Sequence, residues 1–133
     1  MKTNKKTWVI LTLVGLILVG LPIGVFLLGI IEVQREEKAK INRAKLDIKT
    51  LDQAVITYRD RHKGLYWPQL LEILAEPDPE DNSPPILNDK TVLVDPWGNP
   101  YNYEPASVSP SVEKPKIWST GPPDKQMMIT NFD

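Results

Sequence analysis

The fold of this chain is decided by residues 41–62, which read INRAKLDIKTLDQAVITYRDRH. Apolar side chains recur along this stretch at alternating spacings of three and four residues, so they line one face of an α-helix. This packing stripe consists of Ile41, Ala44, Ile48, Leu51, Val55 and Tyr58. The sequence predicts that the rest of the domain packs on the stripe, and a coiled-coil seam is the alternative.

The helical pattern extends beyond the stripe in both directions. No glycine or proline interrupts residues 30–63, and Gly64 follows a basic turn of the kind that suits a helix C-terminus. We therefore expect one helix from about Thr7 to about Lys63. His62, the only histidine, is expected at the end of the packing face or as a cap for carbonyl groups there.

Upstream of the stripe, residues 8–31 form a run of 24 without a charged side chain. A helix of this length spans roughly 36 Å, enough for a hydrocarbon core of about 30 Å. Lys2, Lys5 and Lys6 precede the run, which favours a cytoplasmic N-terminus and an exported C-terminal part. A secretory signal peptide is the alternative, but its apolar region is typically about 7–15 residues long and is followed by small residues.

These observations predict two parts. Residues 1–31 would form a cytoplasmic tip and a single transmembrane helix. Residues 32–133 would form an exported domain, in which a helix over 32–63 continues the span. About 100 residues suffice for one small domain.

The C-terminal half is punctuated by proline, since 11 of the 13 prolines follow Glu76. A short helix is expected over 67–75, a polar loop over 76–89, and a tight turn over 95–100. Short strands are expected at 101–103, 116–119 and 128–132, with 91–94 as a strand or an extended approach. Because three short strands need a surface to pack on, the expected fold is α+β, with an antiparallel sheet on the long helix.

The composition limits the classes of function that this chain can have. Without the three N-terminal lysines the chain has 13 basic and 17 acidic residues, a net charge of −4, which does not indicate a nucleic-acid surface. There is no cysteine and one histidine, so the sequence offers no thiol chemistry, no multi-histidine metal site and no convincing catalytic triad. We predict no catalytic residue and no enzyme activity.

The motifs of the C-terminal half resemble, in the same order, those of the major pseudopilin of bacterial type II secretion. The residues that carry the resemblance are Asp95-Pro96-Trp97-Gly98-Asn99-Pro100-Tyr101, then Ser119-Thr120-Gly121-Pro122 and Ile129-Thr130-Asn131-Phe132, preceded by Tyr66-Trp67-Pro68 and a helix over 44–58. The resemblance implies a pilin-like structural subunit, anchored in the bacterial inner membrane with its C-terminal domain, residues 32–133, in the periplasm. Its implied partners are other pseudopilin or secretion-system subunits, with self-association into a short periplasmic filament.

Two segments depart from the family's pattern. The family carries a Gly-Phe-Thr-Leu-x-Glu motif that is cut after the glycine, whereas Lys6-Thr7-Trp8-Val9-Ile10-Leu11 stands here without that glycine or glutamate. A permanently anchored interaction module that does not polymerise is therefore the alternative function. The family also typically binds calcium in the loop before the final strand. That loop holds one acid here, Asp124, so we predict no calcium site and no other cofactor.

Overall fold

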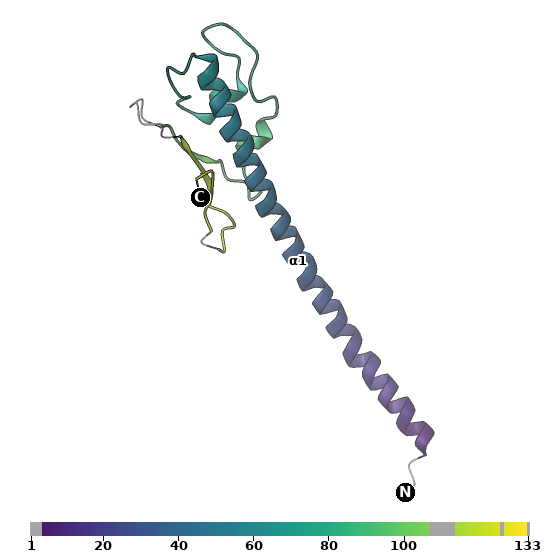
Figure 1. Ribbon diagram of the computed structural model, residues 1–133. Coiled ribbons are helices and arrows are strands. Elements are labelled where there is room, and N and C mark those ends of the chain that lie inside the picture. The colour runs from purple at the N-terminus through teal and green to yellow at the C-terminus, as the bar shows by residue number, and fades with distance from the viewer. Residues whose placement is uncertain (1–3, 107–113, 126, 133) are drawn as a thin grey trace. The chain divides into compact units, whose positions relative to one another are not determined.

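A computed structural model describes residues 4–106, 114–125 and 127–132, without the side chains of residues 6, 7 and 16–21. These described residues form one long helix, two 3₁₀ turns and three short strands, and the long helix is labelled in Figure 1. Their bounds are α1 Lys5–Arg61, η1 Leu71–Ala75, η2 Lys90–Leu93, β1 Asn102–Glu104, β2 Lys116–Ser119 and β3 Ile129–Thr130. The combination of helix with a small antiparallel sheet confirms the α+β class.

Two compact units divide the chain, Met1–Lys38 and Ala39–Asp133. The predicted division lies after residue 31, so the first unit also includes the charged segment that follows the uncharged run. Within this unit the described structure is α1, with Pro22 inside the helix and the Thr12 hydroxyl bonded to the Trp8 carbonyl at 3.0 Å. Among helices built from the described residues, none combines the length and the apolar character that crossing a bilayer requires.

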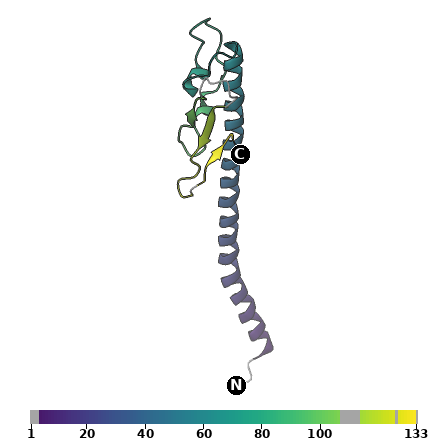
Figure 2. The same cartoon turned by 60° about the vertical axis from the view of Figure 1, so that its left-hand side comes forward.

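The second unit is built on the C-terminal part of α1. Its loops and strands lie along one side of that part of the helix (Figure 2). The packing stripe supplies the helical side of the core, and Leu71, Leu74, Ile117 and Ile129 are among the buried residues opposite. One contiguous core therefore joins the helix, η1 and the sheet.

The helix ends two residues earlier than predicted, at Arg61. The Gly64 amide donates to the Arg59 carbonyl at 2.8 Å, and the Lys63 amide donates to the Asp60 carbonyl at 3.0 Å. These paired bonds form a Schellman motif, in which Lys63 takes the left-handed position with φ 56°. Gly64 also has a positive φ, 74°, so the chain reverses over both residues.

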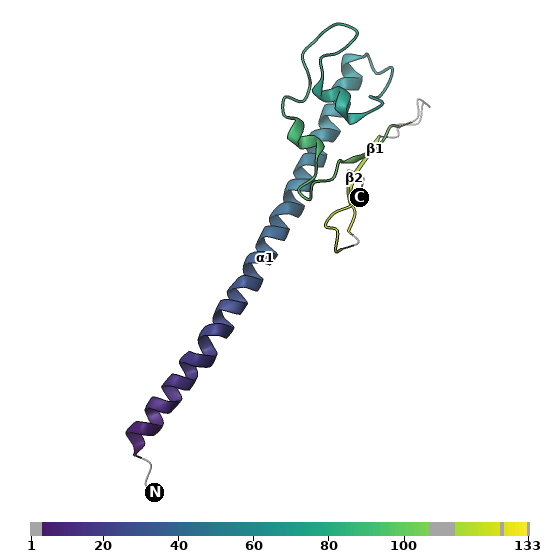
Figure 3. The ribbon, with the colours of Figure 1, turned by 180° about the vertical axis from the view of Figure 1, so that it is seen from behind.

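The sheet has the order β1-β2-β3 and is antiparallel throughout. Figure 3 labels its first two strands, β1 and β2. Asn102 pairs with Trp118, and Trp118 in turn pairs with Thr130. The predicted strand 116–119 is confirmed with the same bounds, β1 lies one residue later than predicted, and β3 is shorter than the predicted 128–132.

Two predicted elements have a different form. The short helix over 67–75 is reduced to the 3₁₀ turn η1, because Trp67 and Pro68 are buried in a non-helical segment and the Pro68 carbonyl accepts a hydrogen bond from the Tyr103 hydroxyl at 2.8 Å. Pro77 favours an extended conformation at Glu76, which ends the turn. Residues 91–94 are mostly the 3₁₀ turn η2, in which the Asp89 carboxylate accepts from the Thr91 amide.

Candidate functional site

The segment Asp95–Asn99 is a tight turn organised by one buried carboxylate. Asp95 is 4% exposed, and its Oδ1 accepts hydrogen bonds from the backbone amides of Trp97 at 3.1 Å and Asn99 at 2.8 Å. The turn is closed by the Asp95 amide, which donates to the Asn99 carbonyl at 2.7 Å. Gly98 has φ 89°, a conformation that a side chain would disfavour. Asp95 therefore fixes the shape of the turn from its centre.

The remaining members of the predicted motif lie around this turn. Pro96 and Trp97 are half-buried, and Trp97 packs against the core. Tyr101 is buried, and its hydroxyl donates to Asp47 Oδ2 on α1 at 3.2 Å. Through Tyr101, the motif therefore joins the turn to α1.

Burial of the Asp47–Tyr101 pair affects both groups. Burial raises the pKa of Asp47 above its ordinary value of 3.8, while the hydrogen bond from Tyr101 and the charge of Arg43 oppose that rise. Burial, and then the neighbouring Asp47, raise the pKa of Tyr101 above 10.0. The Tyr101 hydroxyl therefore remains a hydrogen-bond donor at neutral pH.

The structure buries most of the packing stripe. Ala44, Ile48, Leu51, Val55 and Tyr58 are each less than 8% exposed, while Ile41, at the N-terminal end, is half-buried. Ile41 still packs against the core. The stripe is thus a face that docks on the chain's own domain.

The structure adds three polar residues that the periodicity of the sequence did not single out, and each makes hydrogen bonds between separate segments of the second unit. Ser119 is fully buried and donates to Asp95 Oδ2 at 2.6 Å. Asn131 donates from Nδ2 to Asp52 Oδ1 at 2.8 Å and accepts at Oδ1 from the Ile117 amide at 2.9 Å. Of the three, Asp47 could have been recognised from the sequence, because it lies three residues after Ala44 and four before Leu51, within the apolar face.

The C-terminal end of α1 carries a second cluster of polar side chains. His62 is 7% exposed, with Nδ1 2.9 Å from the Tyr58 carbonyl oxygen and Nε2 3.2 Å from Asp78 Oδ2. The Tyr66 hydroxyl bonds to Glu80, which raises the pKa of Tyr66 to about 12. His62 lies at the end of the packing face, where it connects α1 to the loop after η1.

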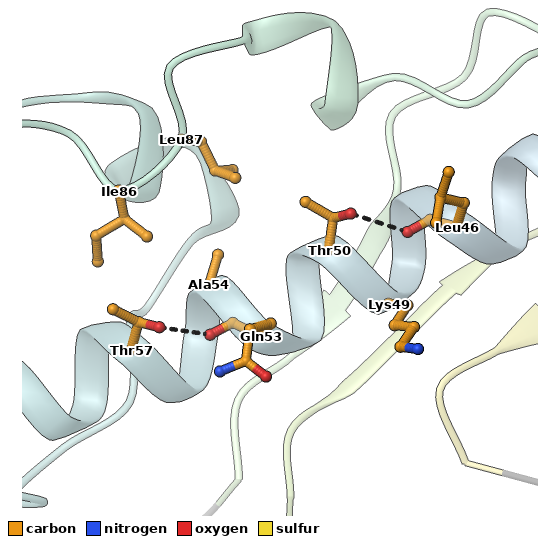
Figure 4. A pocket seen from close by; sticks show the side chains of 8 residues that line it. All are labelled: Leu46, Lys49, Thr50, Gln53, Ala54, Thr57, Ile86 and Leu87. Carbon is orange, nitrogen blue, oxygen red and sulfur yellow. Dashed lines mark hydrogen bonds between the residues drawn. The ribbon is translucent and has the colours of Figure 1, made fainter.

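A groove of about 570 Å³ runs along α1 beside Ile86 and Leu87 (Figure 4). It is lined by Leu46, Lys49, Thr50, Gln53, Ala54, Thr57, Ile86 and Leu87. The hydroxyls of Thr50 and Thr57 are bonded to carbonyls of their own helix, at 3.0 and 2.8 Å. The groove thus presents mostly apolar surface, with the amine of Lys49 and the amide of Gln53 among its polar groups.

The family model described as type II secretion system, protein G matches residues 32–128, which is 97 of the 133 residues. The chain belongs to this family. The resemblance inferred from the motifs is confirmed, and with it a role related to the pseudopilin of type II secretion. No curated protein and no solved structure matches the chain. Membership in the type II secretion protein G family implies interaction with other components of the secretion system.

The calcium site implied by the protein G family can be tested against the oxygen atoms of the loop after β2. Calcium takes six to eight oxygen ligands, commonly with several carboxylates. Asp124 is the one carboxylate between Ser119 and Ile129, and it is exposed. Lys125, Met127 and Met128 line a pocket of about 530 Å³ beside it. Over the described residues, no group of three His, Cys, Asp or Glu side chains is placed to hold a metal ion. The donor set does not fit calcium.

Proposed function

We propose that this chain is a structural, pseudopilin-like subunit of a type II secretion system. The observation that carries the proposal is the match of a protein G family model to a domain whose core is one face of α1. In a domain built in this way, a helix at the centre holds the surrounding segments together, which suits a structural role. Its polar clusters at Asp95, Asn131 and His62 join backbone segments to one another.

The first unit is proposed to cross the inner membrane once, with the second unit in the periplasm. The uncharged run 8–31 is long enough, and basic residues precede it. Its described apolar side chains are widely exposed in the isolated chain, which is unfavourable in water. Those more than 60% exposed are Trp8, Ile10, Leu11, Val25, Phe26 and Leu28.

Fractionation of cells that express the full chain tests the anchor. We expect the chain to remain in inner-membrane vesicles after alkaline carbonate extraction, and protease added from the periplasmic side to degrade the second unit. Recovery in the soluble fraction after extraction would overturn the proposed anchor.

A permanently anchored module that does not polymerise is the second candidate. It is favoured by the segment Lys6–Leu11, which lacks the glycine and the glutamate of the family's cleavage motif. The mass and N-terminal residue of the chain recovered from membranes discriminate between the two. Cleavage near Lys6 would favour the filament subunit, and a mature chain that retains Lys2 would favour the module.

Cross-linking provides an independent test of assembly. Because the chain has no cysteine, one introduced thiol gives unambiguous products. Leu46→Cys places that thiol on the exposed groove of Figure 4. Because each chain then carries one thiol, a disulfide-linked dimer of the chain after oxidation supports self-assembly, whereas only monomers and adducts with another protein support the module.

A further inference from the structure

We propose that the loop between β2 and β3 closes without a metal ion, through a clasp formed by Asp95, Ser119 and Gly121. This inference concerns the second unit alone, so it stands or falls independently of membrane anchoring and assembly. It follows from two features of the described loop residues, one at each end of the loop, and from the poor fit of calcium to the loop's oxygen atoms.

The first feature is a chain of buried hydrogen bonds at the start of the loop. The Ser119 hydroxyl donates to Asp95 Oδ2 at 2.6 Å and accepts from the Gly121 amide at 2.9 Å. Asp95 and Ser119 are 4% and 0% exposed. Hydrogen bonds to an ionised carboxylate are shorter and stronger than neutral ones, and burial removes competition from water. The Asp95 turn thus holds the loop where it leaves β2.

The second feature is the close approach of Gly121 to the far end of the loop. Gly121 has φ 72°, and a Cβ built on it would lie 2.3 Å from the Met127 carbonyl oxygen. That position admits no side chain, because both the backbone conformation and the space require glycine. Within the loop, the Lys125 amide donates to the Pro122 carbonyl at 3.1 Å, and the Met127 amide to the Lys125 carbonyl at 2.8 Å. The two ends of the loop therefore meet through backbone contacts.

Together these contacts hold the loop in the way that a bound cation would. A cation draws loop oxygens toward itself, whereas here the Met127 carbonyl oxygen occupies the space where a Cβ of residue 121 would lie. In this loop, which holds one carboxylate, the described contacts that join its ends are the buried hydrogen bonds of Ser119 and the packing at Gly121.

Thermal unfolding of the full chain in detergent, followed by tryptophan fluorescence, tests the proposal. We expect the same Tm in excess EGTA and in millimolar calcium chloride, and no heat of calcium binding by titration calorimetry. A Tm that rises by about 5 °C or more in calcium, or micromolar calcium binding, would overturn the proposal.

Variants test the clasp itself. Ser119→Ala and Gly121→Ala are each expected to lower Tm by roughly 5–15 °C in both buffers. Thr120→Ala, at an exposed position between them, is the matched control and should leave Tm unchanged. A wild-type Tm for Ser119→Ala, or recovery of its Tm in calcium, would contradict the clasp. If Gly121→Ala does not fold, Ser119→Ala and the comparison of the two buffers still decide the question.

Discussion

The side-chain amide of Asn131 donates a hydrogen bond to Asp52 Oδ1 over 2.8 Å, which joins the residue after β3 to the C-terminal part of α1. The same Nδ2 donates to the Pro115 carbonyl at 2.9 Å, and the Oδ1 accepts from the Ile117 amide at 2.9 Å. One half-buried amide therefore connects the helix, the approach to β2 and the end of the sheet. Both donors and the acceptor of the amide are used, so a change of its chemistry cannot be compensated locally.

Replacement of Asn131 should destabilise the second unit. Asn131→Ala is expected to lower the free energy of unfolding by about 2–4 kcal/mol, because three hydrogen bonds are lost and the Ile117 amide is left without its acceptor. Denaturant unfolding of the full chain in detergent, followed by tryptophan fluorescence, measures the change. Asn102→Ala, at an exposed position on β1, is the control and should alter stability by less than about 0.5 kcal/mol. Equal effects of the two variants would contradict the connecting role of Asn131.

Asp47 should make stability depend on pH. Because burial raises the pKa of Asp47 in the folded state, the protonated carboxyl is the form that the fold favours. The stability that the protonated Asp47 gives to the fold is fully present below the ordinary pKa of 3.8, and it is lost as pH rises through the raised pKa. Asp47→Asn keeps an acceptor for Tyr101 without the charge, so it is expected to be more stable than the wild type at pH 7.

The advantage of Asp47→Asn should disappear as the pH falls below 3.8. Thermal unfolding of both chains between pH 3 and pH 8 checks this dependence. Asp60→Asn changes an exposed carboxylate on the same helix and should stay within about 0.5 kcal/mol of the wild type. A lower stability of Asp47→Asn at pH 7 would show that the ionised carboxylate is the favoured form.

The sequence predicts the helix and the strands of this fold better than its polar contacts. The spacing of the stripe depends only on the helical period, so it survives in the structure as the buried face. Asp52 and Asn131, by contrast, are 79 residues apart, and no local pattern predicts that they meet. The prediction of a helix over 67–75 was wrong for a related reason, because the Pro68 carbonyl accepts a hydrogen bond from Tyr103 on the distant strand β1.

Two leucines on α1 provide a direct test of the buried face. Leu51 is 0% exposed, whereas Leu46, five residues earlier and on another side of the helix, is 63% exposed. Leu51→Ala is expected to lower the free energy of unfolding by about 2–5 kcal/mol through lost apolar burial and a cavity. Leu46→Ala makes the same chemical change and should cost less than about 0.5 kcal/mol. Comparable losses in denaturant unfolding would mean that the opposite face of the helix is also covered.

The C-terminal end of α1 offers substitutions with opposite effects at neighbouring positions. Lys63 holds the left-handed position with φ 56°, which is unfavourable for a residue with a side chain. Lys63→Gly should therefore raise the free energy of unfolding by about 0.5–1 kcal/mol. Gly64 has φ 74° and open space where a Cβ would lie, so Gly64→Ala should lower it by about 1 kcal/mol through backbone conformation alone. Denaturant unfolding measures both changes. Destabilisation by Lys63→Gly would contradict the left-handed conformation of Lys63, because glycine adopts that conformation more readily than any other residue.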